Sequence, residues 1–171
     1  MTVTATQPPE ATSLVSAIAR LAGMIGASHY PNGDRAALRR WTPGQPVPLA
    51  FYRLWLWHLG QEIPSERQIE AWATLAWGIA TCGTGCHDPH RPLGRALTEC
   101  RFAEGRLERL LSAPDDVRLD LFMSAVRFLA AQGERFDWHD AALFLLTTDA
   151  DKRESLHRRI ASDYYRHQPK D

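Results

Sequence analysis

Apolar residues recur every three or four positions along nearly the whole chain, and no stretch alternates apolar and polar residues as a half-buried strand does. This spacing predicts an all-α fold, a helical bundle of about nine helices. Five of the expected helices cover residues 12–26, 35–41, 49–59, 93–98 and 103–112. The other four begin at the capping box of residues 65–68 and at Asp115, Asp137 and Asp149, and the one that Asp115 opens extends to about residue 131.

Polar and glycine-rich stretches set the expected boundaries of this bundle. Residues 1–11 are polar and contain two prolines, so we expect a flexible N-terminal tail followed by a single all-helical domain over residues 12–166. Residues 82–92 are rich in glycine, cysteine and histidine and predict a flexible loop. Alternatively, the bundle divides at this loop into two packed sub-bundles, residues 12–81 and 93–166.

Several acidic residues stand where a helix is expected to begin. Asp34, Asp115, Asp137 and Asp149 are predicted to cap free backbone N–H groups, and the capping-box sequence of residues 65–68 is expected to do the same for the helix at 69. Gly-x-Ser-x-Gly, His-Glu-x-x-His and phosphate-binding glycine motifs are absent from the sequence. We therefore predict a protein that is not an enzyme and has no cofactor.

Composition places the chain among ordinary globular proteins. Its 171 residues are 44% hydrophobic and 23% charged, which supplies a core and excludes disordered and fibrous classes. No apolar run approaches the roughly 20 residues of a membrane-spanning helix, and the first ten residues do not resemble a secretion signal. Three cysteines are an odd number in a chain without a visible secretion signal, so we expect no disulfide framework. We therefore expect a cytoplasmic protein without membrane contact.

Positive charge is carried almost entirely by arginine. The chain has 20 basic and 20 acidic residues, which excludes a uniformly basic nucleic-acid binder, but every basic residue except Lys152 and Lys170 is arginine. High genomic GC content would produce this bias, and so would a need for the planar guanidinium, which grips phosphates and stacks on bases. Between residues 11 and 61 there are five arginines and one acid, so a local basic face remains open.

Three groups of basic residues are candidates for such a face. The alternative for each group is a solvated helix face with weak ion pairs, and acids interleaved with the second group favour that alternative there. The groups are Arg35, Arg39 and Arg40; Arg101, Arg106 and Arg109, interleaved with Glu104 and Glu108; and Lys152, Arg158, Arg159 and Arg166 on the last helix.

One loop contains the residue types of a zinc site. Cys82, Cys86, His87 and His90 could supply two thiolates and two imidazoles to a tetrahedral ion. All four crowd a nine-residue loop, however, whereas structural zinc sites usually draw ligands from two separated elements. We predict no metal here and keep zinc as an alternative.

The six tryptophans offer a second kind of candidate chemistry, stacking on nucleic-acid bases. Trp41, at the end of the first arginine group, is the one candidate for stacking. The others that lie in apolar helices are predicted to pack in the core, namely Trp55, Trp57, Trp72 and Trp77.

Five segments in a fixed order carry a resemblance to a known family. They are residues 33–40 (GDRAALRR), 50–54 (AFYRL), 93–97 (LGRAL), 101–107 (RFAEGRL) with Leu110 and Leu111, and 136–138 (FDW). Their order and spacing resemble the CasB family, the small subunit of the Cascade complex of type I-E CRISPR interference. The resemblance extends from about Leu14 to Tyr165.

The resemblance implies a non-catalytic subunit of an RNA-guided antiviral surveillance complex. Its partners would be the other Cascade protein subunits, a second copy of itself, the guide RNA and the target DNA. A basic surface would hold the opened DNA, including the displaced strand, and the guide–target hybrid, through phosphate contacts that are independent of base sequence. Arg39, Arg40 and Arg53 match the family's early basic positions, and Arg95, Arg101 and Arg106 match a later basic stretch.

We expect folding to bring the nucleic-acid-binding residues together in one continuous basic track. Two alternatives stay open: a scaffold subunit whose arginines meet acidic patches on neighbouring proteins, and a small zinc-binding helical protein that uses the 82–90 loop. The residues expected to contact nucleic acid are Arg35, Arg39, Arg40, Arg53, Arg95, Arg101, Arg106, Arg109, Lys152, Arg158 and Arg159.

Overall fold

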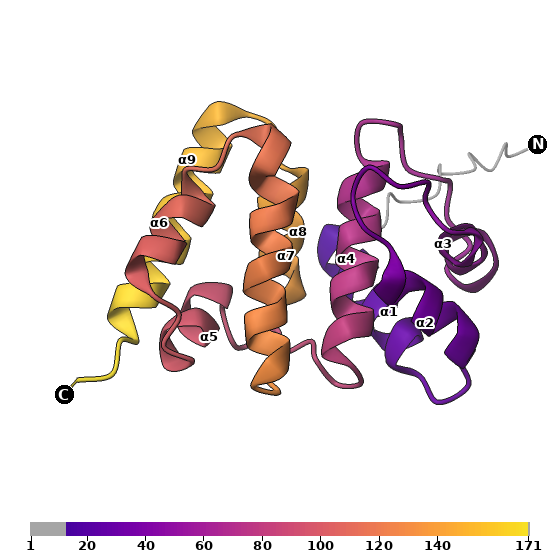
Figure 1. Cartoon of the computed structure of the whole chain (residues 1–171), viewed down its shortest axis with the longest axis horizontal. Coiled ribbons are helices and arrows are strands. Elements are labelled where there is room, and N and C mark those ends of the chain that lie inside the picture. Colours follow the sequence, from indigo (N-terminus) through magenta and orange to yellow (C-terminus); the bar gives the residue numbers. More distant parts are fainter. Residues whose placement is uncertain (1–12, 171) are drawn as a thin grey trace, which may run out of the picture.

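A computed structural model describes residues 13–170, and over this range the chain forms nine α-helices, a short π-helical segment and no β-strand (Figure 1). The all-α prediction is confirmed, and the predicted tail at 1–11 lies outside the described residues. The helices are α1 (Leu14–Gly26), α2 (Asn32–Arg40), α3 (Leu49–Arg53), the π-helical η1 (Leu54–His58), α4 (Ile69–Cys82), α5 (Leu93–Glu99), α6 (Glu104–Leu111), α7 (Asp115–Ala131), α8 (Trp138–Leu146) and α9 (Ala150–Arg166).

The helices form two groups that meet along α4, α7 and α8. In Figure 1, α1–α4 lie on one side and α5–α9 on the other, and α4 and α7 run side by side in the middle. Helix α4 also packs against α1, α2 and α8, while α9 packs against α5 and α8. Buried side chains from both groups form one continuous cluster. The division into sub-bundles 12–81 and 93–166 stays a prediction.

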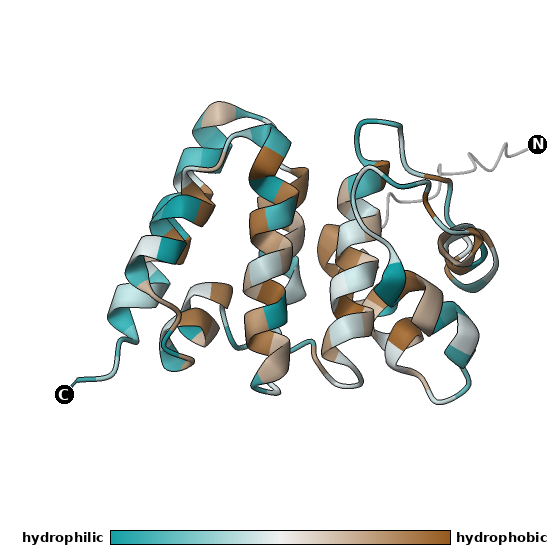
Figure 2. Cartoon of the chain, in the orientation of Figure 1, coloured by the Kyte–Doolittle hydropathy of each residue, from teal (hydrophilic) through white to brown (hydrophobic). Residues whose placement is uncertain are grey.

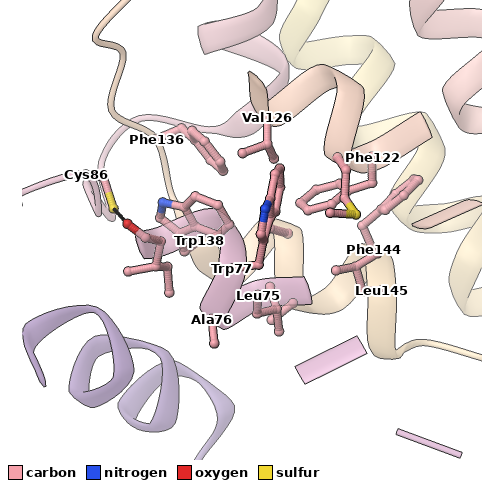
Figure 3. Close-up of a cluster of buried hydrophobic side chains, with 14 of the residues drawn as sticks. Leu75, Ala76, Trp77, Cys86, Phe122, Val126, Phe136, Trp138, Phe144 and Leu145 are labelled. Carbon is pink, nitrogen blue, oxygen red and sulfur yellow. Dashed lines mark hydrogen bonds between the residues drawn. The ribbon is translucent and has the colours of Figure 1, made fainter. Parts of the chain in front are cut away.

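Helix α4 is central because its sequence is apolar on every side. All residues from Ala73 to Ala80 are buried, as expected for a helix surrounded by other helices. Figure 3 shows Trp77 of α4 beside Trp138 of α8 and Val126 of α7. In Figure 2 the outer faces of α6 and α9 are largely hydrophilic, whereas hydrophobic residues concentrate toward the middle of the molecule. The end of the molecule formed by α6 and α9 therefore offers polar surface to partners.

Two of the four predicted aspartate caps are confirmed. The Asp137 and Asp149 carboxylates accept hydrogen bonds from the backbone N–H groups of His139 and Lys152, at 3.0 and 2.9 Å. These bonds satisfy donors that the first helical turn leaves free.

The other predicted caps are wrong. Helix α2 begins at Asn32 and α7 at Asp115 itself, each directly after a proline, so Asp34 and Asp115 lie inside the first turn. Their carboxylates bind the guanidinium groups of Arg53 and Arg153 through charge-assisted hydrogen bonds. The expected capping box at 65–68 also fails, because α4 begins at Ile69 and its N-cap residue makes no side-chain hydrogen bond.

The predicted helix at 49–59 divides into α3 and the π-helical η1. The Leu59 N–H donates to the Leu54 carbonyl oxygen at 2.9 Å, the i→i+5 pattern of a π turn. The assignment of Trp57 to the core is wrong, because this residue is 75% exposed. Trp55 and Trp77 are buried and Trp72 is partly buried, so these tryptophans pack as predicted.

Helix α5 approaches α9 so closely that Gly94 has no room for a side chain. A Cβ atom there would lie 2.9 Å from the Asp163 Cβ and 3.0 Å from the Tyr164 nitrogen, and would overlap the Ile160 carbonyl oxygen. We expect Gly94→Ala to lower the free energy of unfolding by about 1–3 kcal/mol, because the helices must separate.

The matched control is Gly105→Ala on α6, where a Cβ atom meets nothing within 4 Å. This change should raise the free energy of unfolding by about 0.5–1 kcal/mol, because alanine loses less backbone entropy than glycine in a helix. Urea unfolding followed by circular dichroism measures both. Equal stability of the two variants would contradict close α5–α9 packing.

Candidate nucleic-acid interface

The first arginine group contains one structural residue and two free ones. The Arg35 guanidinium donates to the carbonyl oxygens of Ile25 (2.9 and 3.0 Å) and Ala27 (3.0 Å), and so satisfies acceptors at the C-terminus of α1. Arg39 and Arg40, in the last turn of α2, are exposed and have no carboxylate partner among residues 13–170. Their position at a helix C-terminus is favourable for a cation whatever they bind.

Arg53 is tied to the only acid of its region. Its guanidinium donates twice to the Asp34 carboxylate, at 2.8 and 3.3 Å, and this bidentate pair joins α3 to α2. The five arginines of residues 11–61 therefore divide by role, since Arg20 also donates to the Leu59 carbonyl oxygen. Arg39 and Arg40 remain available to a ligand.

The second group, around α6, is largely exposed. Arg101 and Arg109 are exposed and have no carboxylate partner in the described part of the chain. Arg106 lies over the rings of Phe102 (4.5 Å) and Phe128 (5.2 Å). Arg95, in the first turn of α5, instead pairs with Glu99 at 2.7 Å.

Helix α6 separates the charges that its sequence interleaves. Arg106 reaches toward α7, where its guanidinium lies 3.4 Å from the Ser124 hydroxyl. Glu104 and Glu108 point the other way and line a groove against α9. At about 100° per residue, Arg106 and Arg109 fall on the side of the helix opposite these glutamates. Matching numbers of acids and bases in this segment therefore do not cancel on the surface.

Of the four residues of the third group, on α9, Arg158 and Arg159 are paired, whereas Arg166 is exposed and has no carboxylate partner among residues 13–170. Arg158 donates to Glu154 at 3.2 Å, and Arg159 pairs with Asp140, a buried carboxylate whose pKa is raised by burial. Asp140 also accepts from the Leu93 N–H at 3.0 Å, so Arg159 helps to hold α9 against α8 and α5. Lys152 is exposed and has no carboxylate partner within residues 13–170.

The predicted residues do not gather in one place. Helix α2 lies toward one end of the long axis of the molecule, and α6 and α9 lie toward the other (Figure 1). Two separate basic groups thus replace the expected continuous track. We call Arg39 and Arg40 the α2 group, and Arg101, Arg106 and Arg109 the α6 group.

Sequence reasoning missed a further exposed arginine beside the α6 group. Arg127 of α7 is exposed and its guanidinium lies 5.0 Å from the centre of the Trp77 ring. It stands one helical turn after Ser124, which Arg106 contacts. The polar stripe of α7, Asp116, Asp120, Ser124 and Arg127, was the signal in the sequence, obscured by the apolar residues around it.

The cysteine and histidine loop is occupied by structural contacts. The Cys86 thiol is buried and lies 3.8 Å from the Ile79 carbonyl oxygen, and the His87 Nδ1 accepts from the Trp138 N–H at 3.1 Å. Burial raises the pKa of Cys82 to about 12 and that of Cys86 to about 11, so both thiols are protonated at neutral pH. The side-chain donor atoms of Cys82, Cys86, His87 and His90, all within the described residues, do not converge as a ligand set.

A different trio does converge, Asp137, His139 and Asp140. Both of its carboxylates are already used, since Asp137 caps α8 and Asp140 binds the Leu93 N–H and Arg159. This cluster is explained by the packing of α8.

Trp41 is not available for base stacking, so that prediction is wrong. Its side chain is buried, and the indole N–H donates to the Gln45 carbonyl oxygen at 3.1 Å. The proline-containing segment after α2 folds back over the ring, which the helical pattern alone does not show.

Fold and surface together define an all-helical protein with two exposed arginine groups at separate ends and with its cysteines buried or partly buried. The chain belongs to the CRISPR-associated protein Cse2 family, whose model matches residues 34–165. The resemblance to CasB is thereby confirmed, and the protein is a structural subunit of the CRISPR Cascade complex that associates with other Cascade subunits. Neither the curated proteins nor the solved structures gave a match. Among the described residues, no helix is both long and apolar enough to cross a membrane.

Burial makes the fold sensitive to acid at two histidines. Burial, and then the nearby Arg118, lowers the pKa of His157, while burial lowers the pKa of His87. Arg118 is only 4% exposed and its guanidinium lies 3.2 Å from His157 Nε2, which must therefore be the acceptor and carry no proton. Below the ordinary histidine pKa of about 6.5 the unfolded chain binds protons that the folded chain excludes.

We therefore expect the free energy of unfolding to decrease as the pH falls from about 7.5 to 5.5. His157→Gln keeps an acceptor for Arg118 but does not titrate, so it should flatten this decrease. Urea unfolding midpoints across the range measure it. A variant that shows the same pH dependence as the wild type would contradict the neutral state of His157.

Proposed function

We propose that this Cascade subunit holds unwound target DNA, including the displaced strand, and the guide–target hybrid through its exposed arginines. The observation that supports this most is that four of the predicted arginines, Arg39, Arg40, Arg101 and Arg109, are exposed and make no carboxylate pair, backbone bond or ring contact among residues 13–170. An unpaired guanidinium keeps all its donors for phosphate oxygens and releases counterions when it binds them.

The remaining predicted residues contribute unequally to this proposal. Arg35, Arg53 and Arg159 hold helices together, so a phosphate would have to displace contacts on which the fold depends. Arg95 and Arg158 form exposed pairs within one helix, each worth less than about 1 kcal/mol, which a phosphate could replace. Lys152 and Arg106 complete the surface that a strand would contact.

The energetics of strand opening give a reason for such contacts. The RNA–DNA hybrid is about as stable as the duplex that it replaces, so R-loop formation is nearly balanced. A few phosphate contacts can then decide the outcome. Two basic groups at separate ends suit a long polyanion that runs along the molecule, and phosphate contacts are blind to base sequence.

Charge reversal of the α2 group tests the proposal. We expect Arg39→Glu/Arg40→Glu to weaken binding of single-stranded DNA equally for all sequences, and to lower the salt slope by roughly 0.7 for each phosphate that the protein no longer neutralises. The matched control is Arg67→Glu/Arg166→Glu, which changes charge equally at exposed arginines outside the proposed set.

Filter binding at several salt concentrations, with the isolated protein and the assembled complex, measures both variants, and circular dichroism checks the fold. Equal effects of the two variants on strand binding would mean that the net charge of the protein, and not the α2 group, determines the affinity for DNA. Unchanged strand binding by Arg39→Glu/Arg40→Glu in both settings would favour a scaffold whose arginines meet proteins.

A further inference from the structure

A groove between α6 and α9 is a large polar-rimmed hollow that the proposed function does not use. It has a volume of about 710 Å³ and its floor includes Leu107, Leu111 and Ala161. The groove exists because α6 packs against α7, whereas α9 packs against α5 and α8. Leu107 is buried, and Leu111 and Ala161 are the apolar lining residues that stay partly exposed.

The rim of this groove is acidic. Glu104 and Glu108 of α6 and Glu154 of α9 line it, together with Tyr165 and His157, and none of its lining residues is lysine or arginine. Arg158 pairs with Glu154 but is itself 76% exposed, so it neutralises the rim only weakly. Tyr165, 49% exposed, donates its hydroxyl to Glu104 and adds an aromatic face to the rim.

This charge excludes nucleic acid as the occupant. Three carboxylates around an apolar floor repel phosphates, and the arginines of the same helix lie on its opposite side. An apolar floor with a charged rim is the usual anatomy of a protein–protein interface. Charge complementarity then calls for lysine or arginine on the partner.

We infer that the α6–α9 groove docks a lysine- or arginine-bearing amphipathic segment of a different Cascade protein subunit. Apolar side chains of that segment would cover Leu111 and Ala161, and its cations would meet the rim glutamates. Membership of a family of Cascade subunits supplies the protein partner, and strand binding is not needed for this inference.

The experiment reverses the rim charge in the full chain and reconstitutes Cascade from its other subunits and guide RNA. The groove variant is Glu108→Arg/Glu154→Arg. The matched control is Asp116→Arg/Asp120→Arg, which changes the net charge equally on the exposed face of α7. We expect the groove variant to enter the complex roughly tenfold less well and the control to enter normally.

Affinity of each isolated variant for single-stranded DNA separates this inference from the proposed function. If the groove binds protein, the groove variant binds single-stranded DNA at least as well as the wild-type chain, because it gains positive charge and keeps every exposed arginine. Should the reversed variant fail to fold, Glu108→Gln/Glu154→Gln replaces it, with a several-fold loss expected.

Three outcomes would overturn the inference. The first is normal incorporation of the groove variant, and the second is an equal loss with the control. The third is a change only in self-association of the isolated chain, measured by sedimentation, which would assign the groove to a second copy. Loss of incorporation confined to the groove variant supports it, whether or not the arginine groups prove to bind DNA.

Discussion

The contact between Trp138 and Gly78 is the constraint on which the arrangement of the two helix groups depends. The Trp138 indole is fully buried against α4 at Gly78, where a Cβ atom would overlap the ring and lie 2.8 Å from its Cζ3 atom. The backbone N–H of Trp138 donates to His87 Nδ1, and the ring of Phe136 packs beside the indole at 4.6 Å (Figure 3). One residue thus joins α4, α8 and the loop between α4 and α5. Because this junction is close-packed, the basic groups at either end keep a fixed relation.

Arginine has two roles in this protein, and only one of them leaves the side chain available to bind nucleic acid. Where a guanidinium meets backbone carbonyls or a carboxylate, as Arg35 and Arg159 do, it replaces missing caps and joins helices. Where it has no such partner in the described structure, as at Arg39 and Arg109, it remains a donor for an external anion. The acids and bases of α6 also lie on different sides. Glu104 and Glu108 face the groove against α9, whereas Arg106 and Arg109 lie on the opposite side of the helix. One surface helix can in this way present a nucleic-acid face and a protein face.

The sequence alone predicts most of the helices, but it predicts less well which side chains their surfaces expose. Helical periodicity is local, so most helix boundaries, and the caps at Asp137 and Asp149, could be predicted. Asp34 could not, because its partner Arg53 lies 19 residues away and only folding brings the two together. The π turn of η1, on which the exposed Trp57 lies, has no signal in the apolar pattern. The roles of Arg35 and Arg159 depend on tertiary contacts, and so does the separation of the basic groups.

The central claim is that Arg39, Arg40, Arg101 and Arg109 contact nucleic acid, and arginine-selective chemical modification tests it most directly. The protein is treated with phenylglyoxal with and without single-stranded DNA, and modified residues are counted by mass spectrometry. We predict protection of Arg39, Arg40, Arg101 and Arg109 by the strand, with Arg67 and Arg166 equally reactive in both states. Equal modification of the first four with and without DNA would contradict the account.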